Sequence, residues 1–337
     1  MGHPQALSVT SSQDRGKMRA VGVRRFGGPE ALRVFDIPEA HAGHGQVRVH
    51  VRAAAVNGGD RYLRDGSLGP TVMGPPHIPG FEAAGVVDEI GEGTTTDLRV
   101  GDRVMAVAVP TGPNGGAYVQ YLALPHQWVA RAPAGSTHAE ASTLPMNGLI
   151  ARHALDLLAL PTGRTIAVTG STEAVGGFVI QMAKAADGLT VIADAWPEDV
   201  ALVRSLGADI VVPRGTEFAQ HVLRIMPEGV DGVVDAANLG PAAVARAVRE
   251  GGGISLLPHE NPQNLDPAEL GPHSVHIRTV TLSKVLGDRS RLDRLRHQAE
   301  AGELTLRVAD TLPASQATEV HHLMEAGDVR GRLVLEF

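Results

Sequence analysis

Apolar residues are spaced differently in the two halves of the chain. In the first half, from residue 18 to about residue 145, they alternate with polar residues or form short runs rich in β-branched side chains, as at 45–57, 81–91 and 101–109. Such runs between glycine-rich turns are typical of β-strands. Because no helical spacing intervenes, this half is predicted to be a compact β-rich domain.

Strand-like and helix-like patterns alternate in the second half. A helix over 144–160 is expected to lead into a strand at 165–169. This alternation predicts a parallel, doubly wound sheet with right-handed crossovers and a ligand crevice at the carboxyl ends of its strands. Further strands are expected at 189–194, 208–213, 230–237, 252–258 and 275–283, with helices at 198–206, 218–226 and 241–250.

The last part of the chain returns to β character. A charged helix is predicted over 290–304, and a strand at 332–337 closes the chain. The tail is therefore predicted to rejoin the β-rich domain. That domain would comprise residues 18–145 and 295–337, and the doubly wound domain residues 146–294.

Composition and charge narrow the class of protein. The formal net charge is −7 without any Lys/Arg block, which argues against nucleic acid or an anionic membrane surface as a partner. No apolar run reaches membrane-spanning length, no signal-peptide pattern is found, and the chain has no cysteine. We expect a cytoplasmic protein acting on a small molecule, with residues 1–17 as a flexible polar extension. The fifteen histidines lack partners at ligand spacing, so no metal site is predicted.

The segment 165–184 carries the strongest local motif. A β-branched strand is followed by a turn between Gly170 and Gly176, and then by apolar residues at helical spacing. Strand, glycine turn and helix in this order bring helix amides to the diphosphate of a dinucleotide. The predicted cofactor-binding residues of the turn are Gly170, Ser171, Thr172, Glu173, Ala174, Val175 and Gly176.

Glu173 is unusual for such a turn, where small residues let a diphosphate approach the backbone. A carboxylate about 4 Å from a phosphate charge would cost roughly 4 kcal/mol at an effective dielectric near 20. If Glu173 turns into solvent, screening reduces the cost to roughly 1 kcal/mol or less. If its backbone needs positive φ, strain of about 1 kcal/mol is added. Weakened cofactor binding is therefore expected.

The choice between NAD and NADP stays open at this point. Asp194 ends the second predicted strand of the sheet, at roughly the spacing from the turn at which an acidic residue meets the ribose hydroxyls of NAD. Residues 195–199 contain no basic side chain that would favour NADP. Arg204 and Arg214 are the nearest cations.

Several segments together resemble the medium-chain dehydrogenase/reductase superfamily, and most closely its zinc-independent quinone oxidoreductase (zeta-crystallin-like) branch. The resemblance implies a GroES-like catalytic domain plus a Rossmann domain, an α/β fold, with the active site in the cleft between them. It implies hydride transfer from NADPH or NADH to a quinone or an α,β-unsaturated carbonyl, and a homodimer formed through 275–283. The matching segments are 26–34, 51–66, 76–91, 100–104, 115–125, 203–209 and 331–337.

The resemblance also assigns site residues. Zinc-dependent members carry a cysteine after the strand that here ends near Asn57, and a histidine in a Gly-His-Glu motif. Gly58, Gly59 and Phe81 stand at these places, so a catalytic zinc is not expected.

Three catalytic candidates follow from the segment 51–66. Asn57 and Tyr62 are expected to approach the nicotinamide and the substrate carbonyl, where either could stabilise an oxygen that gains charge. Tyr62 could also deliver a proton. Asp60 is the third candidate. The alternatives are that Asp60 caps a turn or helix and that Tyr62 packs at the domain edge.

A second function is compatible with the same fold. Ile150 stands where related proteins often have a threonine that faces the cofactor. Together with Glu173 and the missing basic residue after Asp194, it suggests a redox-neutral lyase or cyclase with weakened or lost nucleotide binding. A non-catalytic binding protein is a third possibility.

Overall fold

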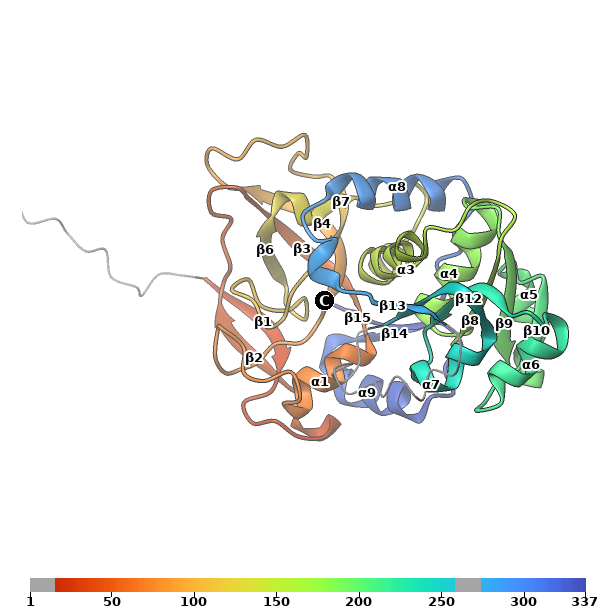
Figure 1. Ribbon diagram of the computed structural model, residues 1–337. Coiled ribbons are helices and arrows are strands. Elements are labelled where there is room, and N and C mark those ends of the chain that lie inside the picture. Colours follow the sequence, from red (N-terminus) through yellow and green to blue (C-terminus); the bar gives the residue numbers. More distant parts are fainter. Residues whose placement is uncertain (1–15, 258–273) are drawn as a thin grey trace, which may run out of the picture.

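The computed structural model describes residues 16–257 and 274–337, and the chain folds into two sheet-centred parts that lie side by side (Figure 1). The predicted extension falls almost wholly outside the described residues. Among the described residues, no helix is long and apolar enough to cross a membrane.

The first part is built on a mainly antiparallel sheet with strand order β14-β15-β3-β4-β5-β7, in which β6 also pairs with β3. The strands β1 (Lys17–Gly22) and β2 (Arg33–Pro38) form a separate antiparallel pair. The remaining strands are β3 (Gln46–Ala55), β4 (Glu82–Ile90), β5 (Arg103–Val107), β6 (Tyr121–Pro125), β7 (Val129–Arg131), β14 (Val308–Pro313) and β15 (Arg332–Glu336).

The C-terminal strand β15 therefore belongs to the same sheet as the N-terminal strand β3. In the register of β15 with β3, Val334 is opposite Ala55 and Leu335 is opposite Ala54. Three helices accompany this part: α1 (Gly58–Asp65), α2 (His138–Ser142) and α9 (Ala317–Ala326). The helix α9 lies beside α1 (Figure 1), where Arg64 Nη2 is 2.5 Å from Glu325 Oε1.

The second part is a six-stranded sheet in which every pairing is parallel, with strand order β10-β9-β8-β11-β12-β13. The order reverses at β8, which marks the switch point where such sheets bind ligands. The strands are β8 (Thr165–Thr169), β9 (Thr190–Ala195), β10 (Ile210–Pro213), β11 (Val230–Asp235), β12 (Val248–Leu256) and β13 (His276–Thr279).

Helices cover both faces of this sheet because successive strand residues point to opposite sides. Ile166 and Val168 belong to the apolar cluster formed with α3, α4 and α8, whereas Ala167 between them belongs to the cluster formed with α6 and α7. The helices are α3 (Pro145–Leu158), α4 (Ala174–Ala185), α5 (Val200–Ser205), α6 (Phe218–Ile225), α7 (Pro241–Val244) and α8 (Arg289–Glu300). The β-rich part and the doubly wound parallel sheet confirm the predicted α/β fold class.

Two local predictions differ from the structure. The helix expected over 241–250 ends early: α7 and a short 3-10 helix (Ala245–Ala247) are followed at once by β12. Val248 is buried and pairs with Val230 of β11, so sheet pairing prevails over the helical spacing of these residues. The boundary expected between residues 294 and 295 falls inside the continuous helix α8.

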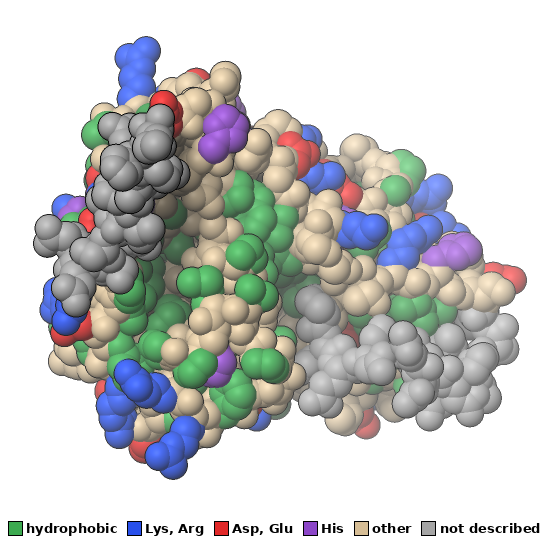
Figure 2. All heavy atoms as spheres, turned by 90° about the vertical axis from the view of Figure 1, so that its left-hand side faces the viewer, with side chains coloured by type: hydrophobic (Ala, Val, Ile, Leu, Met, Phe, Trp, Pro, Cys, Tyr) green, Lys and Arg blue, Asp and Glu red, His purple; other side chains and the backbone are tan. Residues whose placement is uncertain are grey.

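The face of the β-rich part shown in Figure 2 carries groups of hydrophobic side chains between scattered charged ones. Lys and Arg side chains stand there in small groups rather than as a continuous basic surface. This arrangement agrees with the net charge of −7.

Candidate functional site

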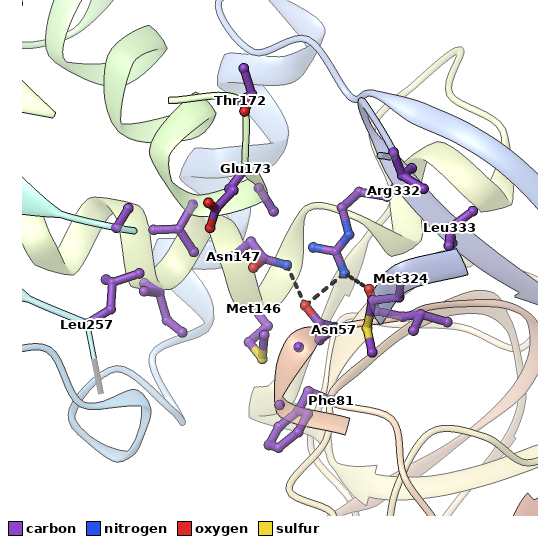
Figure 3. A pocket seen from close by; sticks show the side chains of 18 of the residues that line it. Asn57, Phe81, Met146, Asn147, Thr172, Glu173, Leu257, Met324, Arg332 and Leu333 are labelled. Carbon is purple, nitrogen blue, oxygen red and sulfur yellow. Dashed lines mark hydrogen bonds between the residues drawn. The ribbon is translucent and has the colours of Figure 1, made fainter. Parts of the chain in front are cut away.

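A cavity of about 810 Å³ lies between the two parts. Its volume is in the range of ordinary small-molecule sites. The β-rich part contributes Asn57, Tyr62, Phe81, Met324 and Arg332 to its wall, and the parallel-sheet part contributes Met146, Asn147, Ile150, Thr172, Glu173, Trp196, Arg214, Asn238 and Leu257 (Figure 3).

The glycine turn after β8 forms one end of this cavity. Gly170 has φ 65°, and an added Cβ there would lie 2.8 Å from the backbone of Ala236. A Cβ on Gly176 would lie 2.1 Å from the carbonyl oxygen of Gly170. Both positions therefore require glycine. They hold the turn tightly against the sheet, so that α4 begins at the cavity with the N–H groups that a helix leaves unpaired.

Glu173 precedes α4 with φ −77° and ψ 171°, which is ordinary extended backbone. The condition for backbone strain at this residue, a positive φ, is therefore not met. Its side chain is half exposed, and Oε1 lies 2.5 Å from Arg214 Nη2. Burial raises the pKa of Glu173, and the hydrogen bond and charge of Arg214 oppose this rise.

Asp194 lies beneath the turn and does not line the cavity. Its side chain is fully buried, and Oδ1 accepts a hydrogen bond of 3.1 Å from the backbone N–H of Ser171. The Ser171 hydroxyl donates in turn to the Asp194 carbonyl oxygen. Burial raises the pKa of Asp194. The expectation that this carboxylate faces a ribose is corrected: it holds the turn instead.

Asn57 lines the cavity but its amide is fully engaged. Its nitrogen donates to Ala55 O at 3.3 Å and to Glu82 Oε1 at 3.0 Å. Its oxygen accepts from Asn147 Nδ2 at 3.0 Å and from Arg332 Nη2 at 2.7 Å (Figure 3). An amide has two N–H donors and one oxygen with two lone pairs, so Asn57 has no capacity left for a ligand.

Glu82 is the centre of this buried network. Its Oε1 also accepts from Asn147 Nδ2 at 2.7 Å and lies 3.2 Å from Arg332 Nη2, while Oε2 accepts from the backbone N–H of Met146 at 2.9 Å. The side chain is fully buried, which raises the pKa of Glu82, and Arg332 opposes this rise. The network ties β4 and β15 to the start of α3 in the cavity wall. Because it involves residues distant in sequence, the apolar pattern gave no signal for Asn147 or Arg332.

Asp60 lies behind the cavity wall rather than in it. Its side chain is fully buried and accepts hydrogen bonds from the backbone N–H groups of Asn57 and Gly80 and from the Tyr118 hydroxyl, at 2.8, 2.7 and 2.9 Å. Burial raises the pKa of Asp60 to about 6, against these three hydrogen bonds. The prediction of Asp60 as a catalytic group is corrected in favour of the alternative, a helix cap at the start of α1.

Tyr62 lies on α1, lines the cavity and has the guanidinium of Arg61 5.7 Å from its ring centroid. Ile150 also lines the cavity, with 7% of its surface exposed. Gly58 and Gly59 begin α1, and a Cβ on Gly59 would meet the Phe81 ring at 2.9 Å. Within the described ranges, no group of three or more His, Cys, Asp or Glu side chains could hold a metal ion.

A β-rich domain joined to a doubly wound sheet, with a glycine turn facing the cavity between them, is the architecture of a two-domain dehydrogenase or reductase. The family models agree. An alcohol dehydrogenase GroES-like domain matches residues 43–134, and a zinc-binding dehydrogenase model matches residues 206–335. The chain belongs to the medium-chain dehydrogenase/reductase superfamily, in its quinone oxidoreductase branch.

Individual relatives are distant in sequence. The chain is 31% identical to the chloroplastic NADPH-dependent alkenal/one oxidoreductase of Arabidopsis thaliana over 75% of this chain and 66% of that protein. It is similar to the solved structure of a mycobacterial quinone oxidoreductase (27% identity, 95% of this chain and 100% of that chain, TM-score 0.81). It is also similar to that of an NAD-dependent alcohol dehydrogenase (30% identity, 95% and 100%, TM-score 0.82). The chain spans slightly less than two thirds of the first curated relatives it matches.

Proposed function

We propose that this protein is a zinc-independent, NAD(P)H-dependent oxidoreductase that reduces a quinone or the carbon–carbon double bond of an α,β-unsaturated carbonyl compound. The observation that carries the proposal is the glycine turn at the cavity between the two parts. The relatives described above, oxidoreductases and a dehydrogenase by name, favour this function over a redox-neutral lyase or cyclase.

The residues of the turn fit a dinucleotide. Thr172, Ala174 and Val175 line the cavity where α4 begins, so that backbone N–H groups there would hold the diphosphate. When bound, the nicotinamide supplies a hydride. Arg214 offers a cation for the adenosine end, and the relative from Arabidopsis thaliana is NADPH-dependent by name. We therefore propose NADPH as the preferred cofactor.

The chemistry requires few groups from the protein. Phe81, Met146 and Ile150 give the cavity apolar walls that would seat an enone or quinone and exclude water. As hydride reaches the β-carbon, the carbonyl oxygen gains negative charge, which the Tyr62 hydroxyl would stabilise and then protonate. Asn57 would act as a positioning residue, because its amide is held by Asn147 and Arg332.

Phe81 also underlies the zinc-independent assignment. A phenyl ring cannot ligate a metal, and the chain contains no cysteine. We further propose a cytoplasmic homodimer formed through β13, the last strand in the order of the parallel sheet. Light scattering coupled to size-exclusion chromatography would test the dimer, and a monomer at micromolar concentration would contradict it.

The test is NADPH and NADH oxidation, followed at the nicotinamide absorbance, with a panel of enones and quinones. We expect turnover with at least one acceptor, with one reduced product for each nicotinamide oxidised. Tyr62→Phe should lower kcat by about a hundredfold, in the range of general acid catalysis. Tyr121→Phe, at a tyrosine of β6 whose ring packs beside His50, is the matched control and should leave kcat unchanged. A protein that binds neither nucleotide would overturn the proposal.

A further inference from the structure

Arg214 lines the cavity between two carboxylates, those of Glu173 and Asp194. It follows β10, and its backbone N–H donates to Ala195 O at 3.0 Å, which ties it to the end of β9. Its Nη2 is 2.5 Å from Glu173 Oε1, and its Nε is 3.8 Å from Asp194 Oδ2. One guanidinium therefore serves two carboxylates, so this group of three residues carries a net formal charge of −1 when all are ionised.

The position of Arg214 in the sheet suits an arginine that binds the 2′-phosphate of NADP. The carboxyl ends of β9 and β10 lie beside the glycine turn, and this is the place in a doubly wound sheet where an arginine accommodates the 2′-phosphate of NADP. Carboxylate and phosphate oxygens both accept hydrogen bonds from the guanidinium fork. In the free protein, one nitrogen of this fork, Nη2, donates to the Glu173 carboxylate.

Resting on the proposed reductase function, we propose that Glu173 is an internal competitor for Arg214. Its carboxylate binds the guanidinium in the free protein and must release it before the 2′-phosphate of NADPH can bind there. Glu173 thereby lowers the affinity for NADPH more than the affinity for NADH, which has no 2′-phosphate. The residue that is unusual for the turn is, on this view, a determinant of cofactor preference.

Asp194 can hold the Arg214 guanidinium at the site after the ion pair between Arg214 and Glu173 breaks. Asp194 is fixed by Ser171, and among the residues that the structure describes its Oδ2 has no hydrogen-bond partner. Arg214 Nε is the nearest cation to this oxygen that an ion pair records, at 3.8 Å. A guanidinium released by Glu173 would therefore stay at the site, oriented by Asp194, instead of turning into solvent.

The competition is coupled to a proton. The charged groups facing Glu173 are Arg214 after β10, Asp194 at the end of β9, Asp235 at the end of β11 and Arg307 before β14. Burial already raises the pKa of Glu173. A phosphate at Arg214 removes the counter-ion of Glu173 and adds negative charge, and both changes favour the protonated carboxyl. NADPH binding should therefore take up a proton and strengthen as the pH falls toward the ordinary range of a glutamate.

The test compares dissociation constants of NADPH and NADH, measured by nicotinamide fluorescence, for the wild type, Glu173→Gln and Arg214→Met. We expect Glu173→Gln to strengthen NADPH binding about tenfold and NADH binding much less, and Arg214→Met to weaken NADPH binding about tenfold or more with little change for NADH. The NADPH affinity of Glu173→Gln should also vary less with pH. The 2′-phosphate itself titrates near pH 6, so the comparison with this variant isolates the carboxyl.

Matched controls are available in the chain. Glu217→Gln removes an exposed carboxylate near Arg214 in the sequence, and Arg204→Met removes an exposed guanidinium on α5; neither residue lines the cavity. Both should leave both dissociation constants unchanged. Arg214→Lys keeps the charge without the fork and should give an intermediate loss. It also serves if Arg214→Met fails to fold, as judged by circular dichroism.

The outcomes separate the two proposals. Equal gains for NADPH and NADH in Glu173→Gln, or no gain for either, would overturn the competition while leaving the reductase in place. Equal losses for both cofactors in the Arg214 variants would do the same. No binding of either nucleotide to any variant would overturn the competition and the proposed function together.

Discussion

Arg332 and Arg214 line the same cavity, but the ion pairs that they form with Glu82 and Glu173 differ in burial and in hydrogen bonding. The side chain of Glu82 is fully buried, and four groups donate to it, including Arg332. The side chain of Glu173 is 49% exposed, and Arg214 is the one ion-pair partner recorded for it among the described residues. The first pair belongs to a closed network, and the second stands open to the cavity.

The difference in burial and hydrogen bonding determines whether each pair can exchange a partner for a ligand. In the closed network both carboxylate oxygens of Glu82 and the side-chain amide of Asn57 have hydrogen-bond partners, so an exchange would leave a buried group unsatisfied at a cost of about 1–3 kcal/mol. At the open pair, a ligand oxygen or water can replace either partner. Glu82 and Arg332 therefore position the cavity wall, whereas Glu173 and Arg214 can respond to a ligand.

The largest effect on stability should come from removing one partner of the ion pair between Glu82 and Arg332. Glu82→Leu leaves Arg332 buried without its counter-ion, and we expect a loss of about 3–5 kcal/mol in the free energy of unfolding. Urea unfolding followed by circular dichroism would measure it. Glu92→Leu, at an exposed residue, is the control and should change stability by less than about 0.5 kcal/mol.

A second variant distinguishes the cause of that loss. Glu82→Leu combined with Arg332→Leu removes both charges, so part of the stability should return if the unpaired arginine is what destabilises the single variant. A double variant less stable than Glu82→Leu would contradict the description of Glu82 as the counter-ion of Arg332.

The next largest effect is the pH dependence of stability that the buried side chain of His321 should cause. His321 on α9 is fully buried, and burial, together with Arg64, lowers its pKa to about 3. The unfolded chain binds a proton near pH 6.5 and the folded chain does not, so stability should fall as the pH falls from about 6.5 toward 3, by up to about 1.4 kcal/mol per pH unit. Asp60, with its pKa raised to about 6, acts in the opposite direction between about pH 6 and 4.

The variant His321→Gln isolates the histidine. The difference in unfolding free energy between wild type and variant should shrink on acidification, because the variant carries no group that titrates at this position. His322→Gln removes the more exposed neighbouring imidazole, whose charge helps to lower the pKa of His321, and should change the pH dependence much less than His321→Gln. An unchanged slope in His321→Gln would show that the buried histidine is not what sets it.

A smaller effect is expected at the open pair in the absence of cofactor. Glu173→Gln should change the free energy of unfolding by less than about 1 kcal/mol, since an exposed ion pair contributes little. Urea unfolding of the free protein would measure this change beside that of Glu82→Leu. A loss as large as that of Glu82→Leu would mean that Glu173 is structural and that the contrast between the two pairs is wrong.

The smallest expected effect is a change in NADPH affinity on substitution of Ile150. Ile150→Thr places a hydroxyl on the cavity wall, at the position where the family resemblance implies one, and one added hydrogen bond should strengthen NADPH binding by about threefold. Ile150→Val, which shortens the side chain without adding a hydroxyl, is the matched control. Equal affinities in the two variants would exclude a cofactor contact at this position.

The local motifs of the chain were readable without its structure. Alternating and helical spacing predicted the β-rich part, the parallel sheet and the strand, turn and helix around Gly170 and Gly176. The errors fell where partners are distant: the segment at Val248 became a strand because it pairs with β11. Asp60 was predicted as a catalytic candidate and Asp194 as a ribose-binding residue, but the buried partners that hold both side chains could not be predicted from the sequence.

The sequence by itself determined the order of strands and helices, because periodicity and glycine turns act between near neighbours in the chain. It also determined that a carboxylate stands in the turn. Only the tertiary structure decided what that carboxylate does, since its partner Arg214 is 41 residues away and Arg332 is 250 residues from Glu82. Such pairs form when the folded sheets bring distant residues together, and burial then decides whether a pair is closed or free to exchange.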